Sequence, residues 1–131
     1  MNTEEYYKGK RSLYHYCYAW GLNAYEFDIL KRVTRRKKGQ ERQDLKKSLN
    51  VLDIYCRELL KHGQLSAAKP EIMEDSYDYT VDIFVKEKGL SKDEEKILSL
   101  VLSIRRDYGD YLTKVRDLWS IITSMINELD N

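Results

Sequence analysis

Apolar residues recur at alternating steps of four and three through the last third of the chain, without a missed position. Such spacing places the side chains on one face of an amphipathic helix. The register passes through Gly109, and an internal glycine costs a helix only ~1 kcal/mol. The pattern therefore predicts one continuous helix over about 92–129. Its apolar stripe would consist of Ile97, Val101, Ile104, Tyr108, Tyr111, Val115, Leu118, Ile122, Met125 and Leu129.

A helix over 92–129 is long for a chain of 131 residues. At 1.5 Å per residue it would extend ~57 Å, whereas a compact domain of this size is only ~36 Å across. The pattern therefore predicts either an elongated bundle or burial of part of the stripe by another chain. A homo-oligomer formed through helix 92–129 is one expected arrangement.

Capping signals indicate two shorter helices near the start of the chain. Ser12 precedes an aromatic-rich run that stops before Gly21, where a helix can end. Asn23 and Glu26 are spaced as a capping box, in which each side chain accepts the other residue's backbone N–H. The second helix is therefore predicted to begin directly after Asn23 and to continue to about residue 38.

The apolar pattern is interrupted between 34 and 44, where no residue is apolar and no helix face could be buried. We place a break near Gly39, while a single helix over 24–62 is the alternative. Periodicity then resumes, and Gly63 would end this helix. The apolar positions are Leu45, Leu49, Leu52, Cys56 and Leu59.

Residues 77–85 fit both a strand and a helix, because their apolar positions alternate and also recur at helical spacing. A lone strand would have no partner elsewhere in the chain, so we predict a helix. Ser91 and Glu94 form another capping box at the start of the last helix. The sequence thus predicts an all-α, elongated bundle of about five helices in a single domain over 1–131.

Composition agrees with this fold class. One proline and six glycines are too few for a sandwich or barrel with many turns. The chain is 42% apolar and 34% charged, which is typical of a water-soluble helical protein. No run approaches the ~18 apolar residues of a membrane span, and the acidic start MNTEEYY lacks the layout of a signal peptide. We therefore expect a cytoplasmic protein without a membrane partner.

The sequence predicts no metal site and no cofactor. Cys17 and Cys56 are too few for a disulfide framework, and we expect both thiols to be reduced and partly buried. His15 lies two residues from Cys17, so their side chains leave a helix in different directions, and His62 diverges from Cys56 similarly. Structural zinc sites use more compact spacings. Glycine-rich nucleotide-binding motifs are also absent from the sequence.

The segment RELLKH, from Arg57 to His62, is the catalytic candidate. It resembles the Arg-x4-His motif of the HEPN superfamily, whose members are small all-α domains that include many metal-independent ribonucleases. The resemblance covers these six residues. It implies that Arg57 would stabilise phosphate charge and His62 would transfer a proton at a cleft between two protomers. Otherwise Arg57 is a solvent-face residue, and His62 favours the helix C-terminus.

Charge is unevenly distributed, although the net charge is only +1. Residues 31–47 carry nine bases and two acids (+7), and residues 71–95 carry nine acids and three bases (−6). The basic segment could be a solvated linker, an ion-pair partner of 71–95, or a surface that contacts phosphates. Dense bases without an apolar face suit phosphate contact, because affinity comes from releasing counterions. The candidate contacts are Lys31, Arg32, Arg35, Arg36, Lys37, Lys38, Arg42 and Lys46.

Aromatic residues are concentrated near the start of the chain, where six of the eleven tyrosines lie between Tyr6 and Tyr25. A helix over 13–20 would present aromatic rings on nearly every side. Core packing explains such a helix, but tyrosine and tryptophan also dominate binding hot spots and stack on nucleic-acid bases. The candidate partner-binding surface is Tyr14, Tyr16, Tyr18 and Trp20.

Together these patterns favour binding over catalysis. We expect a small non-enzymatic accessory protein that docks on a protein or nucleoprotein complex, with 31–47 contacting phosphates or an acidic protein surface. One alternative is a HEPN-like ribonuclease that uses Arg57 and His62. Another is a purely protein-binding inhibitor or assembly factor.

Overall fold

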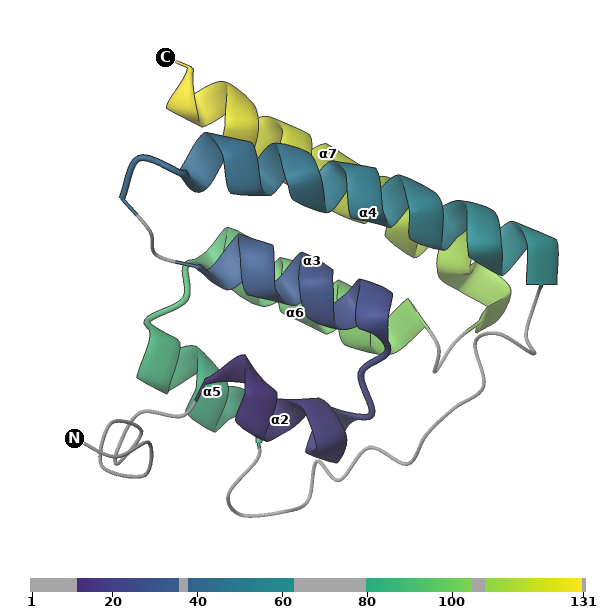
Figure 1. Ribbon diagram of the computed structural model, residues 1–131, viewed down its shortest axis with the longest axis horizontal. Helices are drawn as coiled ribbons and strands as arrows, with labels where there is room; N and C mark the ends of the chain where they lie inside the picture. The colour runs from purple at the N-terminus through teal and green to yellow at the C-terminus, as the bar shows by residue number, and fades with distance from the viewer. Residues whose placement is uncertain (1–11, 36–37, 63–79, 105–107, 131) are drawn as a thin grey trace.

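The computed structural model describes residues 12–35, 38–62, 80–104 and 108–130. Every regular element within these ranges is a helix, which confirms the all-α class (Figure 1). The described part of the chain contains six α-helices, where the sequence pattern predicted about five. They are α2 (Leu13–Trp20), α3 (Ala24–Thr34), α4 (Glu41–His62), α5 (Val81–Lys88), α6 (Lys92–Ile104) and α7 (Tyr111–Leu129), with the 3-10 helix η2 (Tyr108–Asp110) before α7.

Four of these helices, α3, α4, α7 and α6, form a closed bundle in which each packs against two of the others. Neighbouring helices run antiparallel, as the colour along the chain shows in Figure 1. Helices α2 and α5 add a further layer beyond α3 and α6, on the side away from α4 and α7. At one end of the bundle α3 and α7 therefore finish, while α4 and α6 begin.

Capping residues begin α3 and α6 and end α2 where the sequence predicted. Asn23 Oδ1 accepts the backbone N–H of Glu26 at 2.8 Å, and Glu26 Oε1 accepts the N–H of Asn23 at 3.0 Å. Ser91 and Glu94 make the same pair of bonds at the start of α6. Gly21 follows α2 with a left-handed backbone (φ 61°), a conformation that glycine adopts without strain.

The predicted break near Gly39 is confirmed, because α3 ends at Thr34 and α4 begins at Glu41. Gly39 has a φ of 83°, which lets the chain turn between the two helices. Helix α3 is shorter than the expected 24–38, since residues after Thr34 offer no apolar side chain for another turn. The Thr34 hydroxyl donates to the carbonyl of Leu30 at 2.7 Å within the last turn.

The prediction of one continuous helix over 92–129 is wrong. Helix α6 ends at Ile104, α7 begins at Tyr111, and the chain reverses direction between them (Figure 1). The reversal lets both halves of the apolar stripe pack into one core. A turn can leave a register of four and three unchanged on either side, so periodicity alone does not separate one helix from two. The stripe that suggested a homo-oligomer is largely buried within the chain.

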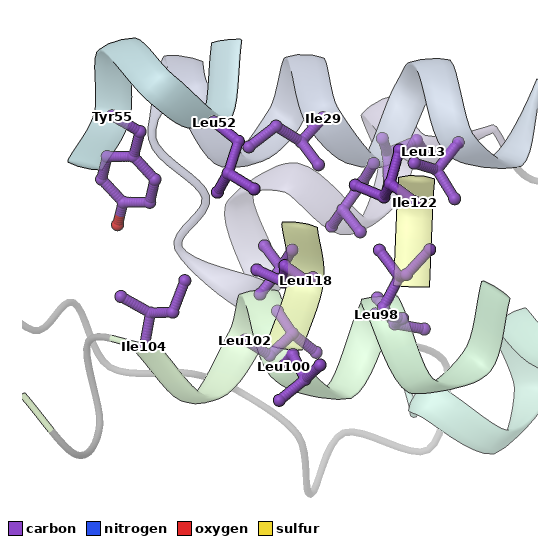
Figure 2. Close-up of a cluster of buried hydrophobic side chains, with 14 of the residues drawn as sticks. Leu13, Ile29, Leu52, Tyr55, Leu98, Leu100, Leu102, Ile104, Leu118 and Ile122 are labelled. Atoms are coloured by element: carbon purple, nitrogen blue, oxygen red, sulfur yellow. The ribbon is translucent and has the colours of Figure 1, made fainter. Parts of the chain in front are cut away.

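The hydrophobic core fills the space between the four bundle helices. Figure 2 shows the side chains of Ile29, Leu52, Leu98 and Leu118 there, one from each helix. All four are fully buried, and burying such a side chain is worth ~1.5–3 kcal/mol. The core also confirms most of the predicted stripe. Its buried members are Ile97, Val101, Ile104, Val115, Leu118 and Ile122.

Three aromatic rings join α2 to α5. Tyr16 and Trp20 pack at 4.7 Å between ring centroids, and Phe84 of α5 meets both edge-on, at 4.9 and 5.3 Å. All three rings are fully buried. The Tyr16 hydroxyl donates to Glu87 at 3.4 Å, so its one polar atom is satisfied across the same junction.

A buried carboxylate ties the start of α3 to α4. Glu26 is almost completely buried, and its Oε2 accepts a hydrogen bond from the hydroxyl of Tyr55 at 2.9 Å. Asn23 Nδ2 donates to the same hydroxyl at 3.3 Å. Tyr25 stacks on the Tyr55 ring with centroids 5.2 Å apart. The capping box of α3 therefore also sets the packing of α3 against α4.

Distance measurement between spin labels will test the reversal between α6 and α7. We expect labels at Lys96→Cys and Ser124→Cys, with Cys17 and Cys56 replaced by alanine, to lie within ~25 Å, because packed helices are ~8–10 Å apart. One continuous helix would separate these positions by ~42 Å at 1.5 Å per residue. A distance distribution centred near the larger value would contradict the fold.

Candidate functional site

Two arginines of the basic segment are engaged within the segment itself. The Nη1 atoms of Arg32 and Arg35, at the end of α3, each lie 3.5 Å from Oδ1 of Asp44 in the first turn of α4. Arg32 also pairs with Asp28 one turn earlier, at 3.0 Å. Asp44 is buried, and the two guanidinium groups are only about a quarter exposed. These arginines therefore hold the α3–α4 turn together.

A third arginine connects the start of α4 to the end of α7. Arg42 donates from Nε and Nη2 to the two carboxylate oxygens of Asp130, at 2.6 and 3.4 Å. The hydrogen bond from Arg42 holds the pKa of Asp130 below its usual range, and the nearby charge of Lys46 acts in the same direction. The same bond raises the pKa of Arg42. Both side chains are close to solvent, so the pair contributes little to stability.

The lysines of the segment behave differently. Lys31, Lys38 and Lys46 are exposed, and no ion pair within the described ranges reaches them. Arg36 and Lys37 lie outside the described residues. Residues 71–79 of the acidic block lie outside the described residues. Within the described residues, the ion pairs of 31–47 are with Asp28, Asp44 and Asp130 rather than with 80–95. A candidate contact with phosphate therefore rests on lysines.

The structure separates the four aromatic candidates into two pairs. Tyr16 and Trp20 were expected on a partner-binding surface, and this expectation is wrong because both rings are fully buried against Phe84. Tyr14 and Tyr18 lie on the opposite side of α2, one turn apart, with 66% and 88% of their surface exposed. Only these two can contact a partner without unfolding α2.

Tyr14 contacts a ring of α3 that is followed one turn later by an exposed lysine. The Tyr14 ring packs on Phe27 of α3 with centroids 4.8 Å apart. Lys31 follows Phe27 by four residues, which places both on the same side of α3. We call Tyr14, Tyr18, Phe27 and Lys31 the aromatic–basic face. The sequence named three of its members but did not indicate Phe27, the ring that joins the two helices.

No family model, no curated protein and no solved structure matches this chain.

Arg57 and His62 do not come together within one chain. His62 follows Arg57 by five positions, so their side chains leave α4 about 140° apart. Each has a local partner one turn away: Arg57 pairs with Asp53 at 3.1 Å, and His62 with Glu58 at 3.0 Å. Both side chains are exposed. The geometry is that of solvent-facing residues on a helix.

Among the described residues, the cysteines and the possible metal ligands give no further candidate for a catalytic site. Cys17 and Cys56 are free and half-buried, and burial is the main cause that raises the pKa of each thiol. Neighbouring carboxylates, Glu26 and Asp53 respectively, raise it further, which disfavours the reactive thiolate. The described residues hold no cluster of three or more histidine, cysteine or acidic side chains suited to a metal ion. None of the described helices is both long and apolar enough to cross a membrane.

Sequence patterns did not reveal a pocket at the end of the bundle where α4 and α6 begin. Its volume is about 400 Å³, and all four bundle helices contribute to its wall. The residues come from helix termini that are far apart in the sequence, so only the antiparallel packing brings them together. The lining consists of Arg32, Val33, Arg35, Glu41, Leu45, Ser91, Asp93, Glu94, Met125, Glu128 and Leu129.

Proposed function

We propose that this chain is a small, non-enzymatic accessory protein that docks on a nucleoprotein complex and contacts its nucleic acid. The observation that carries the proposal is the aromatic–basic face. On it, exposed Tyr14 packs on Phe27, and exposed Lys31 follows Phe27 by one helical turn. Exposed Tyr18 lies one turn from Tyr14 along α2. Lys38, in the turn after α3, supplies a second cation without an ion pair among the described residues.

Rings next to lysines suit single-stranded nucleic acid. An exposed tyrosine ring offers a platform for a base, and such stacking is worth ~1–3 kcal/mol per base. A lysine beside it attracts the neighbouring phosphate and releases condensed counterions. Both groups are needed on one surface, and Phe27 supports this by holding Tyr14 against α3. Lys31 lies one helical turn beyond that contact.

The arginines of 31–47 have a structural role in this proposal. Arg32 and Arg35 share the carboxylate of Asp44, which neutralises part of their charge and fastens the α3–α4 turn. Lys31 precedes these arginines and Lys38 follows them, so both lysines are close in sequence to the anchored contact. We therefore assign phosphate contact to the lysines and anchoring to the arginines.

Substituting residues of the aromatic–basic face should weaken the binding of single-stranded RNA. We expect Tyr18→Ala with Lys31→Gln to weaken the Kd of a fluorescein-labelled 15-mer by about 10- to 100-fold, because the variant removes one stacked base and one bound phosphate. Fluorescence anisotropy at ~50 mM salt, where screening is weak, measures the change.

The matched control is Tyr111→Ala with Lys96→Gln, which removes a tyrosine and an exposed lysine from the α6–α7 side. Because Tyr111 is partly buried, each variant is first checked for an unchanged helical spectrum. An equal loss of RNA binding in both double variants would contradict the aromatic–basic face. If the wild type bound an acidic protein and bound neither RNA nor DNA, the partner would be a protein rather than a nucleic acid.

RNA cleavage provides a separate test of the alternative function. We expect purified protein to leave the RNA 15-mer intact, because Arg57 and His62 are exposed and each is paired with a carboxylate of its own helix. Cleavage that disappears in both Arg57→Ala and His62→Ala, with the fold retained, would favour the ribonuclease instead.

A further inference from the structure

The pocket at the end of the bundle has an apolar floor. Val33 and Leu45 are buried side chains of α3 and α4, and Met125 and Leu129 come from the last two turns of α7. Leu129 is about half exposed, so the apolar floor continues to the surface of the molecule. A volume of about 400 Å³ lies within the range of small-molecule sites, which is ~300–1,000 Å³. An alkyl group of several carbons fits such a space.

Negative charge predominates around this floor. The lining carries the guanidinium groups of Arg32 and Arg35 and the four carboxylates of Glu41, Asp93, Glu94 and Glu128. Asp44 lies directly behind the two arginines and shares its Oδ1 between them. The lining itself therefore has a formal charge of −2, and both of its cations are paired with Asp44.

Two of the carboxylates have roles within the fold. Glu94 Oε1 accepts the backbone N–H of Ser91 at 2.9 Å, and Glu41 Oε2 accepts that of Gly39 at 3.0 Å. Asp93 on α6 and Glu128 on α7 are exposed, and no ion pair to either occurs among the described residues. They stand on adjacent helices at the rim of the same pocket.

The helix dipoles nearly cancel at this end of the bundle. The N-termini of α4 and α6 bring partial positive charge, and the C-termini of α3 and α7 bring partial negative charge. The formal charges therefore decide which ligand the pocket prefers. An anion would meet Arg32 and Arg35 already paired with Asp44, and it would be repelled by the rim carboxylates.

We propose that this pocket binds an ammonium or guanidinium group carried on an apolar stem. The cationic group lies between Asp93 and Glu128, and the stem covers Met125 and Leu129, as the stems of lysine and arginine cover apolar surface elsewhere. Either a free alkyl amine or a basic side chain of a partner protein has this chemistry. The site shares no residue with the aromatic–basic face, so it stands independently of nucleic-acid binding.

Matched probes of opposite charge test the proposal. We expect n-pentylamine and the peptide acetyl-Gly-Arg-Gly-amide to shift backbone amide resonances of Asp93 and Glu128 in ¹⁵N-labelled protein. Sodium pentanoate, which has a similar stem and the opposite charge, and inorganic phosphate should leave these resonances unchanged. Tighter binding of the peptide would indicate a partner's side chain as the natural source, and tighter binding of the amine a small molecule.

Variants with equal charge changes locate the site. Asp93→Asn with Glu128→Gln should weaken the Kd for n-pentylamine by about 5- to 30-fold, since the change removes two partly exposed ion pairs at ~0.5–1 kcal/mol each. The control variant is Glu95→Gln with Asp117→Asn. Both residues are on the same two helices but outside the pocket, so this variant should change the Kd less than ~2-fold. Leu129→Trp, which places a larger side chain at the pocket wall without changing the charge, should also weaken the Kd.

Three results would overturn the proposal. The first is that pentanoate or phosphate binds at these resonances as tightly as the amine. The second is that neither cationic probe shifts them at millimolar concentration. The third is that the control variant loses as much affinity as the rim variant, which would assign the binding to general charge rather than to the pocket.

Discussion

Trp20→Ala should lower the free energy of unfolding by ~3–5 kcal/mol, as removal of a large core ring does. Trp20 is fully buried, packs on Tyr16, and meets Phe84 edge-on. Its removal leaves a cavity at the junction of α2 and α5 and eliminates two aromatic contacts. Urea denaturation followed by circular dichroism measures the change.

Tyr18→Ala is the control for Trp20, because it removes an aromatic ring from the same helix two residues earlier. Tyr18 is 88% exposed, so the loss in unfolding free energy should stay within ~0.5 kcal/mol. Similar losses in the two variants would contradict the division of α2 into a buried and an exposed aromatic side. That division is also a condition for the proposed function, which needs Tyr18 free for a partner.

Leu118→Ala should lower the free energy of unfolding by ~2–5 kcal/mol, within the range for a buried leucine in a packed core. Leu118 is fully buried in α7, where Figure 2 shows it among side chains of α3, α4 and α6. The α6–α7 reversal is what brings α7 into this position. The same denaturation experiment measures the effect.

Leu112→Ala is the control for Leu118, since it makes the same chemical change six residues earlier in α7. Leu112 is 52% exposed, and we expect a loss of less than ~1 kcal/mol. If both variants lost equally little stability, α7 would not pack in the bundle as described.

Local signals were sufficient to predict many of the helix boundaries. The capping boxes at Asn23 and Ser91 and the break near Gly39 depend on side chains and backbone conformations within a few residues. Helical periodicity likewise predicted the burial of Ile104 and Ile122, because the same face of a helix is apolar whether or not the helix is interrupted.

Tertiary features were not accessible from such patterns. The stripe around Gly109 is equally compatible with one helix or a hairpin, and only the need to cover both halves favours the hairpin. Similarly, spacing placed rings on all sides of α2 but did not show that Phe84 of α5 covers Trp20. Side chains at the ends of different helices become neighbours only in the folded bundle.

The candidate site was predicted in part. Lys31 and Tyr18 could be named from the sequence, because lysine and arginine are concentrated in 31–47 and tyrosine is concentrated near the start of the chain. The engagement of Arg32 and Arg35 with Asp44 depends on the turn between α3 and α4, whose geometry the sequence did not specify. The pocket required four helix termini to meet, and no segment on its own contains that information.

The salt dependence of RNA binding tests the central claim most directly. If 31–47 engages about five phosphates of a single strand, the logarithm of the binding constant should fall with the logarithm of salt concentration at a slope of about −3.5. Replacing Lys31 and Lys38 with glutamine should make the slope shallower by about 1.4. Each lost contact between a lysine and a phosphate of a single strand changes the slope by about 0.7. The account predicts this change with the thermal stability preserved. No binding of RNA or DNA by the wild type at ~50 mM salt, or an unchanged slope in the variant, would contradict it.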